Sequence, residues 1–357
     1  MFDHIVIGGG INGLLTAYYL NQAGASVCLL ERAIVGKESS WAGGGILSPL
    51  YPWRYPEAVT ELVQWSQQVY PELVNTLYQS TGLDPELHRS GMLVLSEPQI
   101  DQAMNWAQQT HAELSLIDSD QIRHLEPKLG PIPNQALWMP QVGQVRNPRF
   151  VAALREHLIR HGVQIQENSE VTDLIVENQA VCGVKTEQAD FRAAAVAVTC
   201  GAWSSRFWPE QEDHLQITPV KGQMVLLKTE PGLVQRIVLF ADKYLIPRLD
   251  GRVLIGSTLE HVGFNKSTTD TAQDNLLDFA HHLIPALQDF PVEHHWAGLR
   301  PGTPDNIPRI CEHPTLKGLF INAGHFRNGV VTAPASAQLL TNLMLKQQTI
   351  LDPKPYC

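Results

Sequence analysis

Cysteine is scarce in this sequence, and its spacing provides no metal-binding motif. The five cysteines are scattered, mostly set in apolar stretches, and form no CxxC pair: Cys28, Cys182, Cys200, Cys311 and Cys357. Such thiols are typical of a reducing compartment, so we expect reduced, structural cysteines and a cytoplasmic location. Histidine is more frequent, but the pairs at 281–282 and 294–295 are adjacent, which directs their two rings apart. We therefore expect no metal site.

Positive charge and long apolar runs are also lacking. The net charge is −10 at pH 7, whereas nucleic-acid binding requires clustered lysines and arginines. No stretch approaches the roughly 18 apolar residues of a membrane-spanning helix, and no basic segment precedes an apolar one at the N-terminus, so we expect no signal peptide. We expect no nucleic-acid partner and no integral membrane contact. The length indicates about two domains.

What the sequence does contain begins almost at residue 1, with the pattern of a dinucleotide-binding βαβ unit. An apolar strand at 5–7 leads into Gly8, Gly10 and Gly13, which fit the spacing G-x-G-x-x-G. These glycines turn the chain, admit a pyrophosphate and allow close helix–strand packing. Glu31 ends the next strand, where a carboxylate can accept hydrogen bonds from ribose hydroxyls. This unit alone leaves NAD and FAD open as cofactors.

Helical and strand patterns alternate along the rest of the chain. Helices are expected at 56–81, 98–110, from 147 to about 162, at 270–284 and at 331–346, with Asn147 as an N-cap and proline after it. Short β runs are expected at 91–96, 163–166, 171–176, 181–185 and 191–199, and a β meander at 216–255. We expect an α/β protein (α+β overall) whose Rossmann-like domain is discontinuous and carries an inserted, mostly antiparallel β-sheet domain.

Four further segments bear on chemistry. Residues 39–46 place two serines before three glycines, which suits close approach to a flat ligand, although a flexible loop would read the same way. The apolar strand at 193–199 ends in a small turn. Arg300 lies between apolar residues and a proline turn, where a guanidinium usually meets an anion or an internal salt bridge. Residues 318–331 repeat the strand–turn–helix pattern, which points a second helix N-terminus at the ligand.

Taken in order, these segments resemble the glycine oxidase and D-amino acid oxidase family of FAD-dependent enzymes, in particular the glycine oxidases of thiamine biosynthesis. The resemblance covers nearly the whole chain and also includes the segments 219–223, 244–248 and 256–260. The strings RPGTP at 300–304 and GHFRNG at 324–329 are its most discriminating parts.

The resemblance implies non-covalent FAD, because Cys311 lies beyond the position at which some relatives link the flavin. It implies a FAD-binding domain of residues 1–86, 146–213 and 299–357, and a substrate-binding domain of residues 87–145 and 214–298. The ADP half is assigned to Gly8, Gly10, Ile11, Asn12, Gly13, Glu31 and Arg32, with Val171 near the adenine and Gly201 in the turn after the 193–199 strand. The pyrophosphate and isoalloxazine are assigned to Ser39, Ser40, Gly43, Gly44, Gly45 and Ile46. The ribityl chain and flavin carbonyls are assigned to His325, Phe326, Arg327, Asn328, Gly329, Val330 and Val331.

The same resemblance implies a small amino acid or amine as substrate. Arg300 would bind the substrate carboxylate with Tyr244, Arg327 would lie nearby, and Leu259 and Tyr51 would set the pocket size. Hydride would pass from the α-carbon to flavin N5, giving an α-keto acid (glyoxylate from glycine), ammonia or amine, and hydrogen peroxide from molecular oxygen. Glycine, sarcosine and small neutral D-amino acids are the expected substrates.

Alternatives stay open at this point. A D-amino acid dehydrogenase of the same fold would pass electrons to a quinone, another relative would take N-methyl amines, and a non-catalytic flavoprotein would only bind. An assembly of identical chains is also open. The stiff aromatic segment at 47–56 is interpreted either as a rigid pocket wall or as a surface loop.

Overall fold

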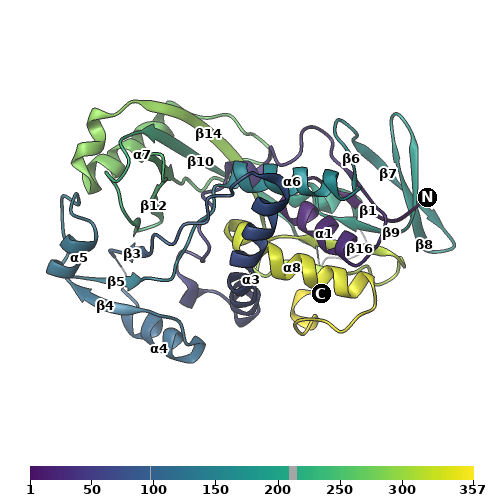
Figure 1. The fold of residues 1–357 in the computed structure, drawn as a ribbon, viewed down its shortest axis with the longest axis horizontal. Helices are drawn as coiled ribbons and strands as arrows, with labels where there is room; N and C mark the ends of the chain where they lie inside the picture. The colour runs from purple at the N-terminus through teal and green to yellow at the C-terminus, as the bar shows by residue number, and fades with distance from the viewer. Residues whose placement is uncertain (97, 209–214) are drawn as a thin grey trace.

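The computed structural model describes residues 1–96, 98–208 and 215–357, and its strands form two eight-stranded sheets. Figure 1 shows one sheet on each side of the molecule, with α3 (Glu57–Thr81) and α6 (Asn147–Arg160) between them. The predicted fold class, a mixed α/β protein with a nucleotide-binding and a mostly antiparallel sheet, is confirmed.

The first sheet has the parallel core that the N-terminal βαβ pattern predicts. Its order is β15-β16-β9-β1-β2-β6, and the neighbours from β16 to β6 are parallel, while β8 pairs antiparallel with β9 and with β7. The strands are β1 (Phe2–Ile7), β2 (Val27–Leu30), β6 (Gln164–Gln166), β7 (Val171–Glu177), β8 (Ala180–Thr186), β9 (Asp190–Val198), β15 (Arg309–Glu312) and β16 (Leu319–Ala323). The central strand β1 is apolar throughout its second half because both of its faces are covered.

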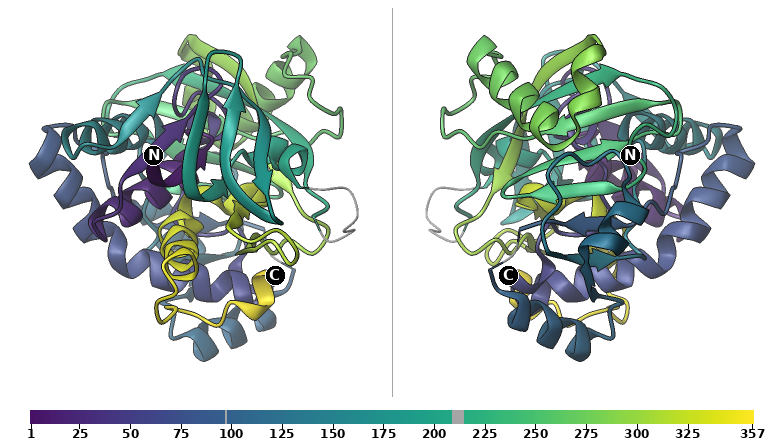
Figure 2. Two further views of the ribbon diagram at one scale, coloured as in Figure 1. Left: turned by 90° about the vertical axis from the view of Figure 1, so that its right-hand side faces the viewer. Right: turned by 90° about the vertical axis from the view of Figure 1, so that its left-hand side faces the viewer.

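Helices cover one face of this sheet. Val6 of β1 packs in a core with α1 (Ile11–Gln22), α3, α6 and α8 (Gly329–Met344), whereas Ile5 and Ile7 pack in a second core on the other face, with β7 and β8. Figures 1 and 2 show α8 beside α1, so the first and last helices of the chain are neighbours.

The second sheet is antiparallel except where β11 pairs with β3. Its order is β14-β10-β13-β12-β11-β3-β5-β4. The strands are β3 (Met92–Val94), β4 (Ser115–Asp118), β5 (Gln135–Met139), β10 (Thr218–Lys228), β11 (Ile237–Phe240), β12 (Lys243–Pro247), β13 (Arg252–Gly256) and β14 (Val292–Gly302). One face packs on α7 (Asp270–Leu283), and the other carries Met224, Tyr244 and Ile246.

The predicted helices are confirmed, with differences of one or two residues at their ends. The helix α4 spans Ile100–Thr110, and α8 begins at Gly329, two residues before the predicted start. Asn147 was expected to cap α6, but the N-cap is Arg146, and the Asn147 amide instead donates to the Ser40 carbonyl at 2.9 Å. The amide therefore serves the 39–46 segment rather than its own helix. The remaining short elements are α2 (Ser39–Ala42), α5 (Ser119–Leu125), η1 (Pro52–Arg54), η2 (Gly201–Phe207), η3 (Pro285–Asp289), η4 (Phe326–Asn328) and η5 (Lys354–Tyr356).

The division of the chain into two domains stays a prediction. Strands of the first sheet come from residues 2–30, 164–198 and 309–323, and strands of the second come from 92–139 and 218–302. The predicted boundary between 298 and 299 falls inside β14, which runs unbroken from one region to the other. The boundary between 213 and 214 lies outside the described residues.

Candidate active site

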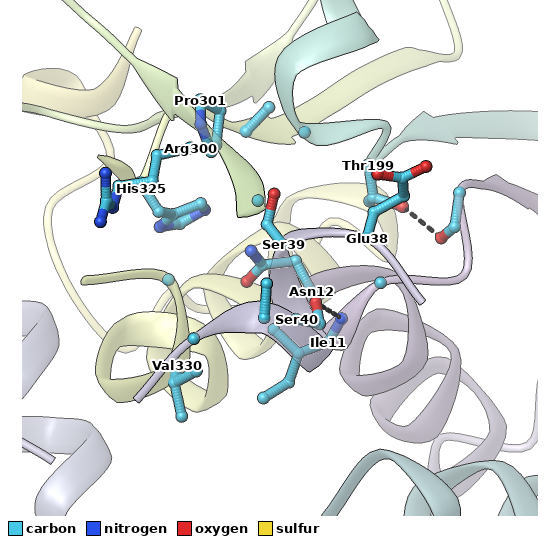
Figure 3. A pocket seen from close by; sticks show the side chains of 18 of the residues that line it. Ile11, Asn12, Glu38, Ser39, Ser40, Thr199, Arg300, Pro301, His325 and Val330 are labelled. Atoms are coloured by element: carbon cyan, nitrogen blue, oxygen red, sulfur yellow. Dashed lines mark hydrogen bonds between the residues drawn. The ribbon is translucent and has the colours of Figure 1, made fainter. Parts of the chain in front are cut away.

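A single long pocket runs along the carboxyl ends of the parallel strands and then under the inner face of the second sheet. Ile7, Leu30, Thr199 and Ala323, which end or follow four neighbouring strands, all line it. This edge is where open α/β sheets bind their ligands. The pocket encloses about 1680 Å³ of empty space, counted to its open mouth. Figure 3 shows Arg300, Pro301 and His325 on one side and Asn12, Ser39 and Ser40 across from them.

At the first helix, the glycine pattern brings backbone close to the pocket. A Cβ on Gly13 would lie 1.9 Å from the Gly8 carbonyl oxygen and 2.6 Å from Thr199 Oγ1, so only glycine allows α1 to pack this tightly against β1. Gly13 itself lies behind the pocket wall, whereas Gly8, Gly10, Ile11 and Asn12 line it. The amide of Ile11, the first residue of α1, donates to Ser40 Oγ at 2.8 Å (Figure 3).

Glu31 is held in place by backbone amides. Its Oε2 accepts from Gly9 N at 2.8 Å and its Oε1 accepts from Ala33 N at 3.0 Å, and the side chain is buried at the pocket wall. A carboxylate has about four lone-pair sites, so Glu31 keeps acceptor capacity for a ligand hydroxyl.

Arg32 joins a cluster that sequence reasoning missed. Its guanidinium pairs with Glu38 at 2.8 Å and lies 3.8 Å from the centre of the Trp203 ring. Glu38 also binds Lys266 at 2.9 Å. Trp203 and Glu38 line the pocket, and neither was among the predicted site residues. Neither position carries a sequence signal for a contact so far along the chain.

The glycine loop at 43–45 is anchored by a residue of the second sheet. Arg248, directly after β12, donates to the carbonyls of Gly44 at 2.8 Å and Val145 at 3.1 Å and to Gln144 Oε1 at 2.7 Å. Desolvation of the guanidinium lowers the pKa of Arg248 to about 10. Gly45 has φ +76°, and a Cβ there would lie 2.1 Å from the Val145 carbonyl oxygen. The loop is therefore fixed in shape, which argues against the flexible-loop alternative.

The turn before α8 is built around a neutral histidine. His325 is buried between Asn322 Oδ1 at 2.7 Å and Thr332 Oγ1 at 2.9 Å, and burial lowers its pKa to about 3. Residues 325–330 line the pocket, and Val331 packs behind them in the core. The N-terminus of α8 thereby faces the same cavity as that of α1.

Arg300 and Tyr244 meet at the far end of the pocket. Arg300 Nη2 donates to Ser257 Oγ at 2.7 Å, and Nη1 donates to the carbonyls of Thr258 at 3.2 Å and Lys221 at 3.3 Å. Burial lowers the pKa of Arg300, and the neighbouring Tyr244 opposes that shift. Within the described residues Arg300 has no carboxylate partner, so the salt-bridge alternative does not hold there.

Two features of this end make it selective for a flat, anionic group. A Cβ on Gly222 would lie 2.1 Å from Arg300 Nη2, so the guanidinium lies against bare backbone. Arg327 has a buried Nε without a hydrogen-bond partner in the structure. Its positive charge lies close enough to lower the pKa of Arg300. Two guanidinium groups thus face one end of the cavity.

Two predicted pocket residues do not line the cavity. Tyr51 is buried, with its hydroxyl donating to the Ala241 carbonyl, and Leu259 is 47% exposed on the outside. Ser48 and Leu50 reach the cavity instead. The 47–56 segment is no surface loop, because the Tyr51 and Trp53 rings pack edge to face at 5.9 Å.

The structure adds three observations on groups considered in the sequence. All five cysteines are free thiols. Among the described residues, no group of three or more His, Cys, Asp or Glu side chains is arranged to hold a metal ion. No helix in that part of the chain is both long and apolar enough to cross a membrane.

Comparison with known proteins assigns the chain to a family. The model of the DAO family, described as FAD dependent oxidoreductase, matches residues 3–343. The chain belongs to this family of FAD-dependent oxidoreductases. It is 44% identical over 353 residues to a glycine oxidase of Pseudomonas aeruginosa, covering 99% of this chain and 97% of that protein.

Further proteins align over nearly the full chain. This chain is 34% identical to the bifunctional protein ThiO/ThiG of Synechocystis, covering 97% of this chain and 52% of that longer protein. The crystal structure of glycine oxidase from Geobacillus kaustophilus superposes with a TM-score of 0.94 at 28% identity, covering 99% of this chain and 97% of that one. The cofactor of this oxidoreductase is therefore FAD.

Proposed function

We propose that this protein oxidises glycine, and amines of similar size such as sarcosine and small neutral D-amino acids, and passes the electrons to molecular oxygen. The products are the α-keto acid, ammonia or amine, and hydrogen peroxide. The observation that carries the proposal is Arg300, whose guanidinium lies beside Tyr244 at the end of the pocket and has no carboxylate partner among the described residues. The identity to glycine oxidases over the whole chain supports the choice of substrate.

The residues present fit FAD. The turn before α1 exposes Gly8 and Gly10 to the pocket, and Glu31 offers spare acceptor sites. We assign the ADP half to this end, the pyrophosphate and flavin to the serine and glycine loop at 39–46, and the ribityl chain to the turn at 325–330. Helix N-termini on both sides favour the negative charge of the phosphates and of reduced flavin. When bound, FAD supplies the acceptor for a hydride from the substrate α-carbon.

The protein's own part in the reaction is positioning. A carboxylate bound by Arg300 offsets the cost of leaving that guanidinium desolvated and unpaired, and the planar fork fixes its orientation. The Tyr244 hydroxyl lies beside Arg300 and, among the described residues, donates only to Met224 Sδ, at the long distance of 3.9 Å, so it is available as a second donor. Holding one reactant in a single geometry is worth several kcal/mol of barrier.

The walls around this position favour a small, uncharged side chain. Leu50, Met224 and Ile46 line the cavity near Tyr244 and are apolar. Among the described residues, the carboxylates that line the pocket are Glu31, Glu38 and Glu170, which adjoin the βαβ end rather than Arg300. A cationic side chain at the substrate end would therefore be left unpaired.

The five free thiols suit a reducing compartment, so we also propose a cytoplasmic location.

A coupled peroxide assay on the purified holoenzyme tests the proposed function. Glycine, sarcosine and D-alanine should produce hydrogen peroxide in air, whereas L-alanine and D-aspartate should produce little. Turnover with an artificial quinone acceptor but no peroxide in air would instead identify a dehydrogenase. Turnover of none of the amines with either acceptor would overturn the proposal.

A further inference from the structure

Outside the pocket, two cysteines far apart in the sequence meet at the edge of the first sheet. Cys311 lies in β15, the last strand of that sheet, and is buried. Cys357 is exposed and directly follows η5, which contacts β15. The two side chains are hydrogen-bonded to each other. Their contact brings one solvent-accessible and one buried thiol together.

The last residues of the chain are held firmly at this place. Tyr356 is fully buried, and its hydroxyl donates to the Ala58 carbonyl at 2.7 Å. The Cys357 thiol also approaches the Pro353 carbonyl, with Sγ 3.4 Å from the oxygen. The buried Tyr356 therefore holds the neighbouring Cys357 beside Cys311.

The Cys357 thiol differs in acidity from the buried cysteines Cys28 and Cys200. Hydrogen bonding by Cys311 lowers the pKa of Cys357 to about 7, so a large share is thiolate near neutral pH. Burial raises the pKa of Cys28 and of Cys200 to about 12, which keeps both as unreactive thiols. Cys182 contacts Arg192 and the Ile175 carbonyl.

We propose that Cys311 and Cys357 form an oxidation site at which hydrogen peroxide converts the two thiols into a disulfide. The Cys357 thiolate attacks one peroxide oxygen, the O–O bond breaks, and a sulfenic acid and hydroxide form. The Cys311 sulfur then attacks the sulfenic sulfur and displaces the hydroxyl group, and the released protons complete two waters. Two thiols are thus oxidised by two electrons and one peroxide is reduced.

The disulfide would close a loop that contains one side of the pocket, and it would thereby stabilise that part of the fold. The covalent loop closed between 311 and 357 would contain β16, the turn at 325–331 and α8, which form one side of the pocket. A cross-link restrains the unfolded state most when it closes a long loop. The source of the peroxide rests on the proposed function, because each turnover would release one molecule of it, whereas the oxidation itself does not depend on that function.

The experiment treats the purified holoenzyme with added hydrogen peroxide, followed by alkylation and mass spectrometry. We expect a mass loss of about 2 Da, two fewer of the five thiols, and a cross-link between tryptic peptides 310–317 and 347–357. The melting temperature should rise by several degrees and fall again with dithiothreitol. The variant Cys357→Ser should show no cross-link, and Cys182→Ser should behave as the wild type.

An unchanged set of five thiols after peroxide treatment, or oxidation of Cys357 to sulfinic acid without a cross-link, would overturn the proposal. A second arm replaces added peroxide with glycine in air, with and without catalase. Cross-linking by added peroxide but not by glycine would leave the oxidation site standing and would count against the proposed peroxide-forming activity.

Discussion

At the residue scale, the candidate site depends on the Arg300 guanidinium, which has no carboxylate partner among the described residues. Arg300 is oriented by Ser257 Oγ and two carbonyl oxygens, so its hydrogen bonds fix a direction without neutralising its charge. A guanidinium held in this way binds an incoming carboxylate at both nitrogen atoms. We propose that the anion that pairs with Arg300 is the carboxylate of the substrate.

Replacing Arg300 tests this role directly. Loss of a charge-assisted partner for a desolvated carboxylate typically costs about 2–5 kcal/mol, so Arg300→Met should lower kcat/KM for glycine by roughly 30-fold to several thousand-fold. Arg300→Lys should recover only part of the activity, because an ammonium lacks the planar fork. The flavin absorbance should persist in both variants. Near-normal kcat/KM in Arg300→Met would show that the carboxylate binds elsewhere.

His325 predicts how stability depends on pH. Its folded pKa of about 3 lies below the ordinary value of 6.5 because the ring is buried, so the unfolded chain binds the proton more readily. Stability from this group is therefore present above about pH 6.5 and is lost as the pH falls toward 3. The melting temperature should drop between pH 7 and pH 5, and the drop should be smaller in His325→Gln. An equal drop in both proteins would contradict the assignment.

At the element scale, the side chain of Arg248 connects the glycine loop at 43–45 to the second sheet. Arg248 extends from the end of β12 to the Gly44 carbonyl and to Gln144 and Val145, which precede α6. The loop at 43–45 therefore takes its shape from strands far away in the sequence. The motif at 244–248 carries part of the resemblance to the family, and its arginine binds the carbonyl of Gly44 in the glycine loop.

Arg248→Met should weaken FAD binding while the sheets stay folded. Hydrogen bonds to charged groups contribute about 1.5–3 kcal/mol each, so losing this set should raise the Kd for FAD by at least about tenfold. Fluorescence titration of the apoprotein with FAD measures the change. The matched control is Arg252→Met, since Arg252 pairs with Glu293 at a more exposed position on the neighbouring strand. Equal affinities in the two variants would refute the proposed role of Arg248.

At the scale of the whole molecule, the sequence predicted most of the elements and the two sheets, because strong periodicity and glycine spacing are local signals. It did not predict β4, a short strand that is mostly exposed, or β5, a short strand that is mostly buried, because neither shows a clear alternation. Asn147 was misread as a cap because its partner, the Ser40 carbonyl, lies more than a hundred residues away. Tyr51 and Leu259 were placed by resemblance, but Tyr51 is buried with its hydroxyl on the Ala241 carbonyl, Leu259 is exposed, and neither lines the pocket.

The residues of the candidate site were also predictable where their signal is local and not where it depends on distant contacts. Residues that use backbone turns, such as Gly8 and the 325–330 turn, were predictable and line the pocket. Residues that act through long-range contacts, such as Arg248, Trp203 and Glu38, were not, because no local pattern specifies which distant group they meet. The predicted domain boundary between 298 and 299 is also not marked by a local signal, because β14 runs through it as the edge strand of the second sheet.

The central claim is that this family member oxidises glycine on FAD, and anaerobic mixing of the yellow holoenzyme with glycine tests it most directly. The flavin absorption should bleach without oxygen, and it should return when air is admitted, with hydrogen peroxide released. Arg300→Met should keep its colour and fail to bleach at the same glycine concentration. A wild-type flavin that stays oxidised with saturating glycine under these conditions would contradict the account.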